Sequence, residues 1–540
     1  MTQDYPVIVS IDFGTTYSGC CYALADTAEV HDIFRWPKSN GSYAKVPSLL
    51  YYKKNGRLLD WGKGARLQSL RPDNDGTLLQ YFKLALITEE IRLPDNKTHV
   101  DVIADYLRMF HDHIYEQLLK TQLLHAYKQC QYRYCLTVPA IWSDESKALM
   151  REAMVQAGIL QEDDPIHRLA LISEPEAAAA YCENKYQSWN LSDGDIFMIV
   201  DAGGGTVDLI TYLIQDATPP RTLSEVTRGN GAMCGSAFID QNMSLLLRSK
   251  LSNGDIPSCM FEMMMDTFIE TIKPNYRGDE TDVYLIPVPA GALQYIQPEF
   301  LNDDHQLIFR PTELRDLVFH PVLKRVVQLV REQLAQVDQY VQAIFLVGGF
   351  GCSEYLYDIL REKFHGLVGE IAMPPRGELA VAQGAVYHLL KPNLVTSKLL
   401  RRTYGVRTRL PFEQGLDPES SAVITKDGIK RCSTRFDVIA HKGQRVFIDQ
   451  SIKRSFWVVY PKHTEADLYA SDSDVIPRQV TDKDSVVKLA ELPIKMPLLP
   501  NVKPGTRMDV TIEFIFGMTE IKMVVHLAGT RTEHLIESHV

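Results

Sequence analysis

Two short apolar runs, far apart along the chain, are each followed by a similar polar turn. Residues 7–11 (VIVSI) lead into residues 12–16 (DFGTT), and residues 196–200 (IFMIV) lead into residues 201–206 (DAGGGT). A continuous apolar run of this length, bounded by Asp and Gly, is typical of a buried strand. A further strand-like run follows each turn, and a long segment follows each pair. The repetition predicts a duplicated fold with two similar lobes.

Strands and helices alternate through both lobes, as they do in α/β domains. Apolar residues recur at helical spacing in residues 102–119, 144–157, 354–364 and 378–390, whereas residues 134–138 and 343–347 are short apolar runs typical of buried strands. We expect lobe I to occupy residues 1–197 and lobe II residues 198–391.

The pattern changes near Pro392 from helical spacing to strict alternation. Apolar residues occupy every second position from Met508 to Phe516 and again from Ile521 to Leu527. Alternation in two neighbouring segments predicts a β-hairpin with one buried face. We expect a β-sandwich-like domain at residues 403–540, joined to lobe II by residues 392–402.

Length and charge narrow the class of protein. A chain of 540 residues is too long for a single hydrophobic core. It carries 57 basic and 68 acidic side chains, a net charge of −11. A negative balance argues against a nucleic-acid or anionic-membrane surface, which would need a basic patch. The same charge would also arise if it served only to keep the protein soluble.

Cysteine usage and hydropathy favour a reduced compartment. Nine cysteines are scattered without a Cys-x-x-Cys pair, so the sequence signals neither a zinc site nor a thioredoxin-like motif. No apolar run is long enough to span a membrane. The first strand begins too close to Met1 for a signal peptide to precede it. We therefore expect a cytoplasmic protein without a membrane span.

The two turns have the chemistry of a phosphate site. Glycine lets the backbone approach a ligand closely, and successive backbone amides form an anion-binding nest. Magnesium prefers oxygen ligands and keeps several waters, so Asp12 and Asp201 beside such turns are suitable residues. Each turn alone is weak support. The chain has neither the Gly-x-x-x-x-Gly-Lys-Ser/Thr pattern of a P-loop nor a Gly-x-Gly-x-x-Gly dinucleotide pattern.

Several motifs in the same order resemble those of the heat-shock protein 70 family across roughly the first 390 residues. The motifs are residues 11–18 (IDFGTTYS), 137–140 (TVPA), 172–179 (ISEPEAAA), 200–208 (VDAGGGTVD), 346–353 (LVGGFGCS) and 380–385 (AVAQGA). They are similar to the family's first phosphate loop, connecting segments, second phosphate loop, adenosine loop and closing helix. The chain looks most like the divergent member-12 branch, and a fungal source is expected.

The resemblance implies an actin-like ATPase fold with two lobes around a nucleotide cleft, followed by a β-rich domain. It implies ATP or ADP and Mg²⁺ as cofactors. Asp12 would hold the metal through water, and Asp201 would help to organise it. The residues that would contact phosphate oxygens are Gly14, Thr15, Thr16, Gly203, Gly204, Gly205 and Thr206.

The resemblance also implies catalytic and adenosine-binding roles. Glu174 and Asp201 would orient the attacking water, with Asp201 as the proton acceptor. Lys83 would stabilise charge on the transferred phosphoryl group. The residues expected around the base and ribose are Lys273, Gly349, Gly351, Ser353 and Glu378.

Simpler interpretations stand beside these roles. Glu174 could only begin a helix, where its charge is favoured by the helix dipole. Lys83 could be a solvated lysine that extends from an amphipathic helix. Gly349 and Gly351 could form only a turn between a strand and a helix.

Two departures from the family concern coupling between the lobes and the β-rich domain. The family's chaperones have an acidic, leucine-rich linker, whereas residues 392–402 here contain Lys398, Arg401 and Arg402 and no acid. No helical-lid pattern or acidic tail follows the β-rich region. We therefore expect weakened coupling to peptide binding.

Three functions remain open. The first is an ATPase whose nucleotide state controls the binding of protein clients or regulatory partners, as in a chaperone. The second is a nucleotide-dependent scaffold with little hydrolysis. The third is a sugar-kinase-like phosphotransferase, since the actin-like fold is shared by such enzymes. The set Asp12, Lys83, Glu174 and Asp201 favours hydrolysis, and the β-rich domain favours a protein partner over a small substrate.

Overall fold

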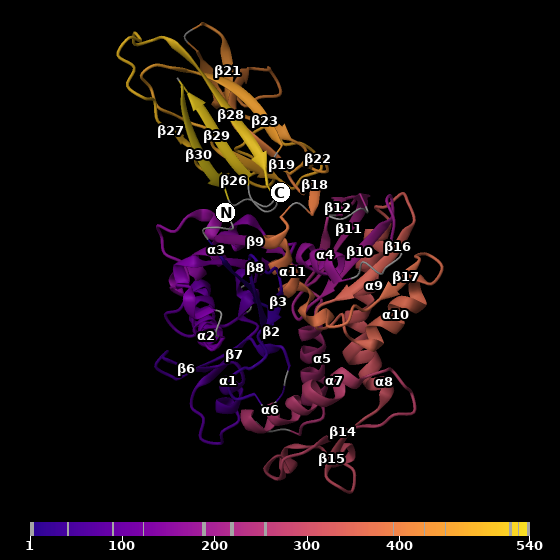
Figure 1. The fold of residues 1–540 in the computed structure, drawn as a ribbon. Coiled ribbons are helices and arrows are strands. Elements are labelled where there is room, and N and C mark those ends of the chain that lie inside the picture. The colour runs from indigo at the N-terminus through magenta and orange to yellow at the C-terminus, as the bar shows by residue number, and fades with distance from the viewer. Residues whose placement is uncertain are drawn as a thin grey trace. The chain divides into compact units, whose positions relative to one another are not determined.

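The structure is a computed structural model, and its chain divides into two compact units. The first unit contains residues 1–221 and 229–394, and the second contains residues 222–228 and 395–540 (Figure 1). The structure describes residues 5–39, 41, 43–88, 91–121, 124–185, 191–216, 221–252, 256–392, 394–425, 427–448, 450–517, 521–527 and 529–536.

The main sheet of lobe I places the first apolar run at its centre. Its strand order is β3-β2-β1-β8-β9, with β4 also paired to β2. The strands are β1 (Val7–Asp12), β2 (Tyr17–Leu24), β3 (Val30–Asp32), β4 (Lys45–Pro47), β8 (Tyr132–Val138) and β9 (Leu169–Ser173). β1 is antiparallel to β2 and parallel to β8. All six residues of β1 are buried, as expected for a strand covered on both faces.

The main sheet of lobe II repeats this arrangement. Its order is β17-β16-β10-β11, with β13 also paired to β11. The strands are β10 (Ile196–Ala202), β11 (Val207–Asp216), β13 (Asn230–Ala232), β16 (Val341–Val347) and β17 (Glu370–Ala372). β10 is antiparallel to β11 and parallel to β16. The series β2-β1-β8-β9 and β11-β10-β16-β17 therefore correspond, which confirms the predicted duplication.

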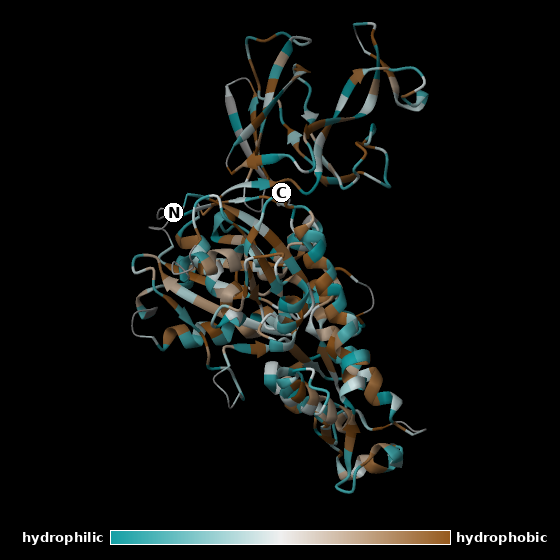
Figure 2. Ribbon diagram, turned by 90° about the vertical axis from the view of Figure 1, so that its right-hand side faces the viewer, coloured by the Kyte–Doolittle hydropathy of each residue, from teal (hydrophilic) through white to brown (hydrophobic). Residues whose placement is uncertain are grey.

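Helices and smaller sheets complete the first unit. Lobe I has α1 (Gly62–Ser69), α2 (His99–Leu119), α3 (Asp144–Gln156), α4 (Glu174–Lys185) and the small sheet β5 (Leu49–Tyr52), β6 (Leu58–Trp61) and β7 (Thr77–Gln80). Lobe II has α5 (Ser236–Ser249), α6 (Ser258–Thr267), α7 (Lys273–Asn275), α8 (Pro311–Glu313), α9 (His320–Leu334), α10 (Glu354–Phe364) and the hairpin β14 (Tyr284–Pro287) and β15 (Gln306–Phe309). The last helix of the unit, α11 (Ala380–Leu390), packs against β1, β2 and β8 of the lobe I sheet. Brown and teal alternate along the longer helices in Figure 2, as expected for helices with one buried face.

The predicted helices and strands of the first unit are confirmed to within a few residues. α3 begins after Ser143, whose side chain accepts a hydrogen bond from Ser146 N at 3.2 Å. The segment predicted as a helix over residues 378–390 is divided into a short 3₁₀ turn, Gly377–Leu379, and α11.

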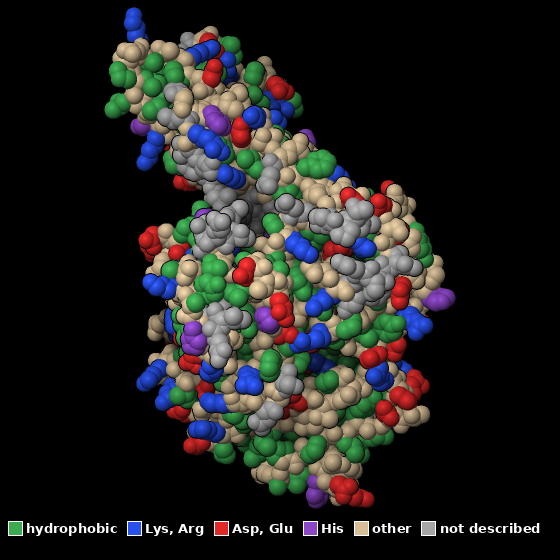
Figure 3. Space-filling view, viewed as in Figure 1, with side chains coloured by type: hydrophobic (Ala, Val, Ile, Leu, Met, Phe, Trp, Pro, Cys, Tyr) green, Lys and Arg blue, Asp and Glu red, His purple; other side chains and the backbone are tan. Residues whose placement is uncertain are grey.

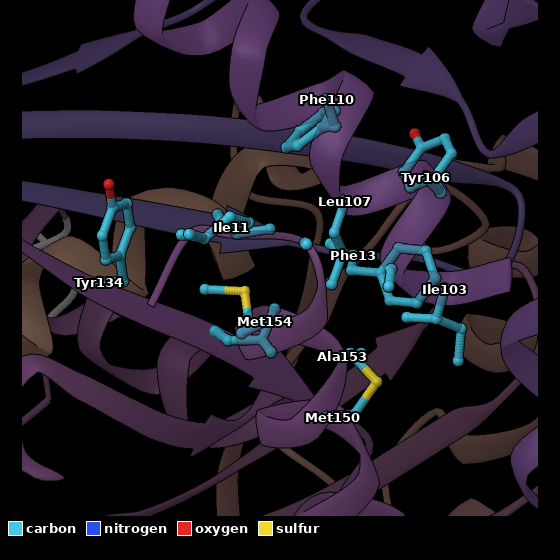
Figure 4. Close-up of a cluster of buried hydrophobic side chains, with 14 of the residues drawn as sticks. Ile11, Phe13, Ile103, Tyr106, Leu107, Phe110, Tyr134, Met150, Ala153 and Met154 are labelled. Atoms are coloured by element: carbon cyan, nitrogen blue, oxygen red, sulfur yellow. The ribbon is translucent and has the colours of Figure 1, made fainter. Parts of the chain in front are cut away.

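The first phosphate loop is anchored in the core of lobe I. Phe13, which directly follows Asp12, is fully buried. Its ring lies 5.9 Å from that of Phe82 and 5.5 Å from that of Tyr106. Figure 4 shows Phe13 among side chains of α2 and α3. Packing of this aromatic cluster fixes the position of the polar residues on either side of Phe13.

Helices α4 and α11 cross at very close range. A Cβ added at Gly384 of α11 would lie 1.7 Å from the carbonyl oxygen of Ala177 in α4. The alanine run of α4 and Gly384 therefore allow the two helix backbones to approach.

The second unit is built almost entirely of strands. One sheet has the order β20-β21-β19-β25-β26, and another has the order β23-β28-β29-β30. The first sheet contains β19 (Thr403–Pro411), β20 (Ala422–Ile424), β21 (Lys430–Ala440), β25 (Leu468–Ser471) and β26 (Val487–Ala490). The second contains β23 (Ser451–Val459), β28 (Arg507–Phe516), β29 (Ile521–Leu527) and β30 (Thr530–Ile536), and a small pair is formed by β24 (Thr464–Glu465) and β27 (Pro493–Ile494). A shared core that includes Tyr404 and Phe516 joins the two larger sheets. β28 pairs antiparallel with β29, which confirms the predicted hairpin.

The stretch expected to connect lobe II to this domain is itself partly a strand. β18 (Val395–Leu399) pairs in parallel with β12 (Thr222–Glu225) and antiparallel with β22 (Arg445–Phe447). Ser224 and Ser397 share a buried hydrogen bond of 2.6 Å between their hydroxyl oxygens. Alternation in the sequence did not reveal this pairing because β12 lies about 170 residues earlier in the chain.

Among the residues that the structure describes, no helix is long and apolar enough to cross a membrane. On the face seen in Figure 3, basic and acidic side chains lie side by side over the first unit.

Replacing Gly384 by Ala should destabilise the first unit. The added methyl group would overlap the Ala177 carbonyl, and overpacking of this kind costs about 1–3 kcal/mol, more than the roughly 1 kcal/mol of helix propensity that Ala gains. Urea denaturation would show a lower midpoint. Gly41→Ala is a matched control, since a Cβ there would meet no atom nearer than 3.9 Å. An unchanged midpoint for Gly384→Ala would contradict the close crossing.

Candidate functional site

The two predicted phosphate loops touch each other across the lobes. A Cβ added at Gly204 would lie 2.2 Å from Thr16 Oγ1, and one at Gly205 would lie 2.3 Å from Thr15 Oγ1. The threonine hydroxyls of lobe I therefore fill the space that side chains at the two glycines of lobe II would need. Glycine is required here by close approach, and each loop contributes polar groups to the same small region.

Each loop also closes a tight turn after its strand. A Cβ at Gly14 would lie 2.2 Å from the carbonyl oxygen of Tyr17, so a larger residue does not fit there. In the second loop Gly203 N donates to Thr206 O at 3.0 Å. Thr206 is buried, and the turn returns the chain into β11.

Four carboxylates are buried around these loops: Asp12, Glu174, Asp201 and Asp208. Asp12 ends β1 and Asp201 lies near the end of β10, so the duplicated strands present them at equivalent places. Burial raises the pKa of Asp201 well above its ordinary value, and the charges of Glu174, Asp208 and Asp12 raise it further. The structure therefore brings together three of the four residues with predicted catalytic roles.

The fourth, Lys83, completes the group. It lies in the 3₁₀ turn Phe82–Leu86, and its Nζ donates to Glu174 Oε1 at 2.7 Å. The Lys83 side chain is 2% exposed and its ammonium group lies 5.0 Å from the ring centre of Trp142. The interpretation of Lys83 as a solvated lysine is therefore wrong. Glu174 is the first residue of α4, so its helix-starting role and its ion pair coexist.

The charge state of Glu174 depends on its surroundings. Burial raises the pKa of Glu174 to about 7, Lys83 acts to lower it, and Asp208 and Asp12 act to raise it. A carboxyl that titrates near neutrality is suited to general acid–base work.

A second lysine, which sequence reasoning missed, is bound to Asp12. Lys45 Nζ donates to Asp12 Oδ2 at 2.7 Å, and Thr137 Oγ1 donates to Asp12 Oδ1 at 3.3 Å. Asp208 was also missed, although it belongs to the motif that identified the second loop. Ile141 N donates to its Oδ1 at 3.2 Å.

The predicted adenosine loop connects β16 with α10. Gly348 has φ +82°, and a Cβ there would lie 2.4 Å from Asp201 Oδ1, which puts this loop directly against the carboxylates. A Cβ at Gly351 would lie 2.0 Å from Val347 O, so Gly351 is needed for the turn itself. Gly349 faces open space, and the Ser353 hydroxyl caps α10 by accepting from Leu356 N at 3.4 Å. Glu378 lies near Cys352, which belongs to this loop. Burial raises the pKa of the Cys352 thiol, and the charge of Glu378 raises it further.

Lys273 lies in lobe II beside a cavity. Its Nζ is bound by both carboxylate oxygens of Asp240, at 2.7 and 2.8 Å. The neighbouring cavity, of about 350 Å³, has walls from both lobes. Arg66 of α1 contributes to it and donates through Nε to Asp266 Oδ1 of α6 at 2.8 Å. The cavity is lined by Arg66, Gln80, Tyr81, Asp240, Gln241, Ser244, Leu245, Phe261, Glu262, Met265 and Ile269.

Comparison with known proteins gives the same relationship as the motifs. The chain is 24% identical to heat shock 70 kDa protein 12A of Homo sapiens, over 96% of this chain and 89% of that protein. It is likewise 24% identical to heat shock 70 kDa protein 12B of Homo sapiens, with the same coverage of both chains. The chain is a divergent relative of the heat shock 70 kDa protein 12 group. A movement protein, Hsp70h, of Lettuce infectious yellows virus is 24% identical over 35% of this chain and 29% of its own length. No family model matches the chain.

The relationship to the heat shock 70 kDa protein 12 group extends beyond the two lobes. Because the alignments span 96% of the chain, they include the β-rich second unit. The relatives support the actin-like fold assigned to the first unit, in which two corresponding sheets carry the two loops. The fungal source stays a prediction.

Magnesium fits one side of this heat shock protein 70-like site better than the other. The donors are carboxylate oxygens, which are the ligand type that magnesium prefers. Lys45 already binds Asp12, so Asp201 and Asp208 are the better candidates to hold the ion. In the described part of the chain, no three His, Cys, Asp or Glu side chains form a protein-only cation site. Magnesium does not need one, since it usually keeps several waters and binds substrate phosphates.

Replacing Lys83 by Met should destabilise the protein most at alkaline pH. Breaking a buried ion pair costs about 3–5 kcal/mol when the other charge stays. Below neutrality Glu174 can avoid that cost by taking up a proton, because its pKa in the folded protein is about 7 and rises further without Lys83. A carboxyl whose pKa is raised by folding loses stability as the pH climbs from its unfolded value of about 4.3 to its folded value. The wild type stops losing stability to this deprotonation near neutral pH, whereas the variant continues to lose stability above neutral pH.

Urea denaturation at about pH 6 and about pH 8 measures the difference in the free energy of unfolding between the wild type and Lys83→Met. We expect this difference to grow by up to about 1.4 kcal/mol per pH unit. The double variant Lys83→Met/Glu174→Gln should show the same deficit at both pH values. A deficit that shrinks with rising pH would contradict the buried Lys83–Glu174 pair.

Proposed function

We propose that the chain binds ATP and ADP with Mg²⁺ between the two lobes, and that it hydrolyses ATP. The observation that carries the proposal is the contact of two Gly/Thr loops from duplicated strands within a cluster of buried carboxylates. Backbone amides at glycine-rich turns and threonine hydroxyls are donors to phosphate oxygens. The relationship to heat shock 70 kDa proteins 12A and 12B supports the same conclusion.

In the proposed reaction, the residues of this chain position and deprotonate the attacking water. Thr15, Thr16 and the amides of Gly204 and Gly205 hold the phosphate chain, while the Gly203 amide closes the turn by donating to Thr206 O. Lys83 neutralises charge on the transferred phosphoryl group while Glu174 keeps the ammonium in place. Asp201 accepts the proton, a role for which its raised pKa is suitable. Asp201 and Asp208 would hold magnesium through carboxylate oxygens, and the bound ion would supply further charge stabilisation.

A nucleotide-dependent scaffold with little hydrolysis is the second candidate. Lys45 favours it, because an ammonium group on Asp12 takes a carboxylate that the family would use toward the metal. The complete Lys83–Glu174–Asp201 arrangement favours hydrolysis, and we rank it first. A phosphotransferase acting on a sugar is less well supported, since the β-rich second unit favours a protein partner over a small substrate.

We further propose that the second unit binds protein clients or regulatory partners. It exposes large apolar side chains on its loops and edges, among them Leu416 at 61%, Ile424 at 80% and Val475 at 79%. Each of these side chains offers apolar area that a protein partner could remove from water. A cytoplasmic location stays a prediction.

Asp201→Asn should keep nucleotide affinity within a few fold and lower single-turnover ATP hydrolysis by about 10²–10⁴, the usual contribution of a positioned base. The amide is isosteric but cannot accept the proton. Asp304→Asn is the matched control, since that aspartate is exposed on the same lobe. Equal turnover in Asp201→Asn and wild type would remove Asp201 from the mechanism.

ATP should change the affinity of the second unit for an unfolded peptide by less than about tenfold, or about 1.4 kcal/mol of coupling energy. The physical reason is that residues 392–402 carry Lys398, Arg401 and Arg402 where the family has acids, so the same charge pairs cannot form. Peptide-binding isotherms with ATP and with ADP measure the coupling. A much larger shift would show that β18 transmits the nucleotide state by another route.

A further inference from the structure

Asp12, Gly19 and Lys45 form a row across three neighbouring strands. Asp12 of β1 is directly opposite Gly19 of β2, and Gly19 is directly opposite Lys45 of β4. Strands in a sheet are about 4.8 Å apart, so the outer two backbones are separated by about 10 Å. A lysine side chain is long enough to cover most of that distance. Strand pairing therefore aims Lys45 at the carboxylate of the first phosphate loop.

Gly19 leaves the path open. A Cβ added there would lie 3.1 Å from Lys45 Cγ and 3.4 Å from Lys45 Cε, because the lysine stem passes over the glycine. Any larger residue at the middle of the row would push the stem away from Asp12. The row is therefore a specific arrangement of three residue types, and not a chance contact of a mobile surface lysine.

The position of Lys45 is costly for a cation. Its side chain is 10% exposed, and burial alone would lower the pKa of the ammonium group. The Asp12 carboxylate overrides that effect and raises the pKa, so the group stays charged. An ammonium group has three N–H donors. In the described residues Asp12 is its one hydrogen-bond acceptor, which leaves donors for a ligand.

Lys45 also lies close enough to lobe II for its charge to act on groups of that lobe. On one side its charge reaches Asp201 of the second lobe as well as Asp12. On the other side it acts on Cys352 of the predicted adenosine loop, where it opposes the effect of burial on the pKa of the thiol. The lysine is thus directed into the space between the two lobes.

We propose that Lys45 is a phosphate-binding residue that supplies part of the charge neutralisation otherwise provided by magnesium. Its ammonium group stays beside Asp12. Through its remaining N–H groups it donates hydrogen bonds to the phosphate chain of a bound nucleoside di- or triphosphate. The inference rests on the proposed nucleotide binding. Because lysine is a fixed cation in a poorly solvated site, its attraction for a phosphate group is stronger than at the protein surface. Nucleotide binding should therefore survive the removal of magnesium.

The test measures the affinity for a fluorescent ADP analogue in excess magnesium and in excess EDTA. We expect the wild type to lose less than about tenfold in affinity when magnesium is removed. In Lys45→Met the same loss should be at least about tenfold larger, since the variant then has an unpaired Asp12 that repels phosphate and favours a cation. Lys45→Arg, which keeps the charge, should remain near the wild type. Lys53→Met is a control for removal of an exposed lysine from the same lobe.

Each alternative has a distinct result. If the wild type binds the analogue in neither buffer, the proposed nucleotide binding fails and this inference fails with it. If the wild type binds in magnesium but Lys45→Met shows the same loss in EDTA, Lys45 is only a counter-ion for Asp12 and the inference alone is overturned. If Lys45→Met does not fold, Lys45→Gln decides the question, because it keeps an N–H donor toward Asp12 and removes the charge.

Discussion

The candidate site of the first unit depends on four carboxylates that are buried where two sheets end. Removing such groups from water is unfavourable unless nearby cations and hydrogen bonds compensate. The structure provides Lys83 for Glu174 and Lys45 for Asp12, each at 2.7 Å. The compensation is incomplete, as the raised pKa of Asp201 shows. Negative charge that is left uncompensated repels phosphate groups, so the proposed nucleotide site depends on the positive charge that the two lysines place beside the carboxylates.

Duplication explains how so many polar groups converge. The two central strands, β1 and β10, are paired with corresponding neighbours in the same directions. Asp12 and Asp201, near the ends of these strands, therefore lie at equivalent positions. The turns after them meet because glycine in one loop leaves room for threonine in the other. Phe13 holds the first turn in place through its aromatic contacts with Phe82 and Tyr106. Precision at the site is therefore a property of two whole sheets and not of the loops alone.

Local patterns were sufficient to predict β1, β10, α10 and the β28–β29 hairpin, because burial on one or both faces sets the spacing of apolar residues. The same patterns, read with the motif resemblance, predicted the loops and most residues of the cluster. Lys45 was not predictable from them, since its role exists only when β4 pairs with β2 and Gly19 lies between. Asp208 was overlooked for a different reason: it is the last residue of the motif 200–208 and lies on β11, beyond the glycine turn to which roles were assigned. Long-range pairing leaves no periodic signal in a single sequence.

The pairing of β12 with β18 has a consequence for how the protein can be divided. Residues 222–228 belong to the second unit, although residues on both sides of them belong to the first. The chain therefore passes between the units at 221–222, 228–229 and 394–395. A gene fragment that starts near residue 395 would encode the β-rich part without β12. One edge of β18 would then be unpaired, and the Ser397 hydroxyl would lose its hydrogen bond with Ser224. Limited proteolysis at a single site would likewise nick the protein without releasing either half.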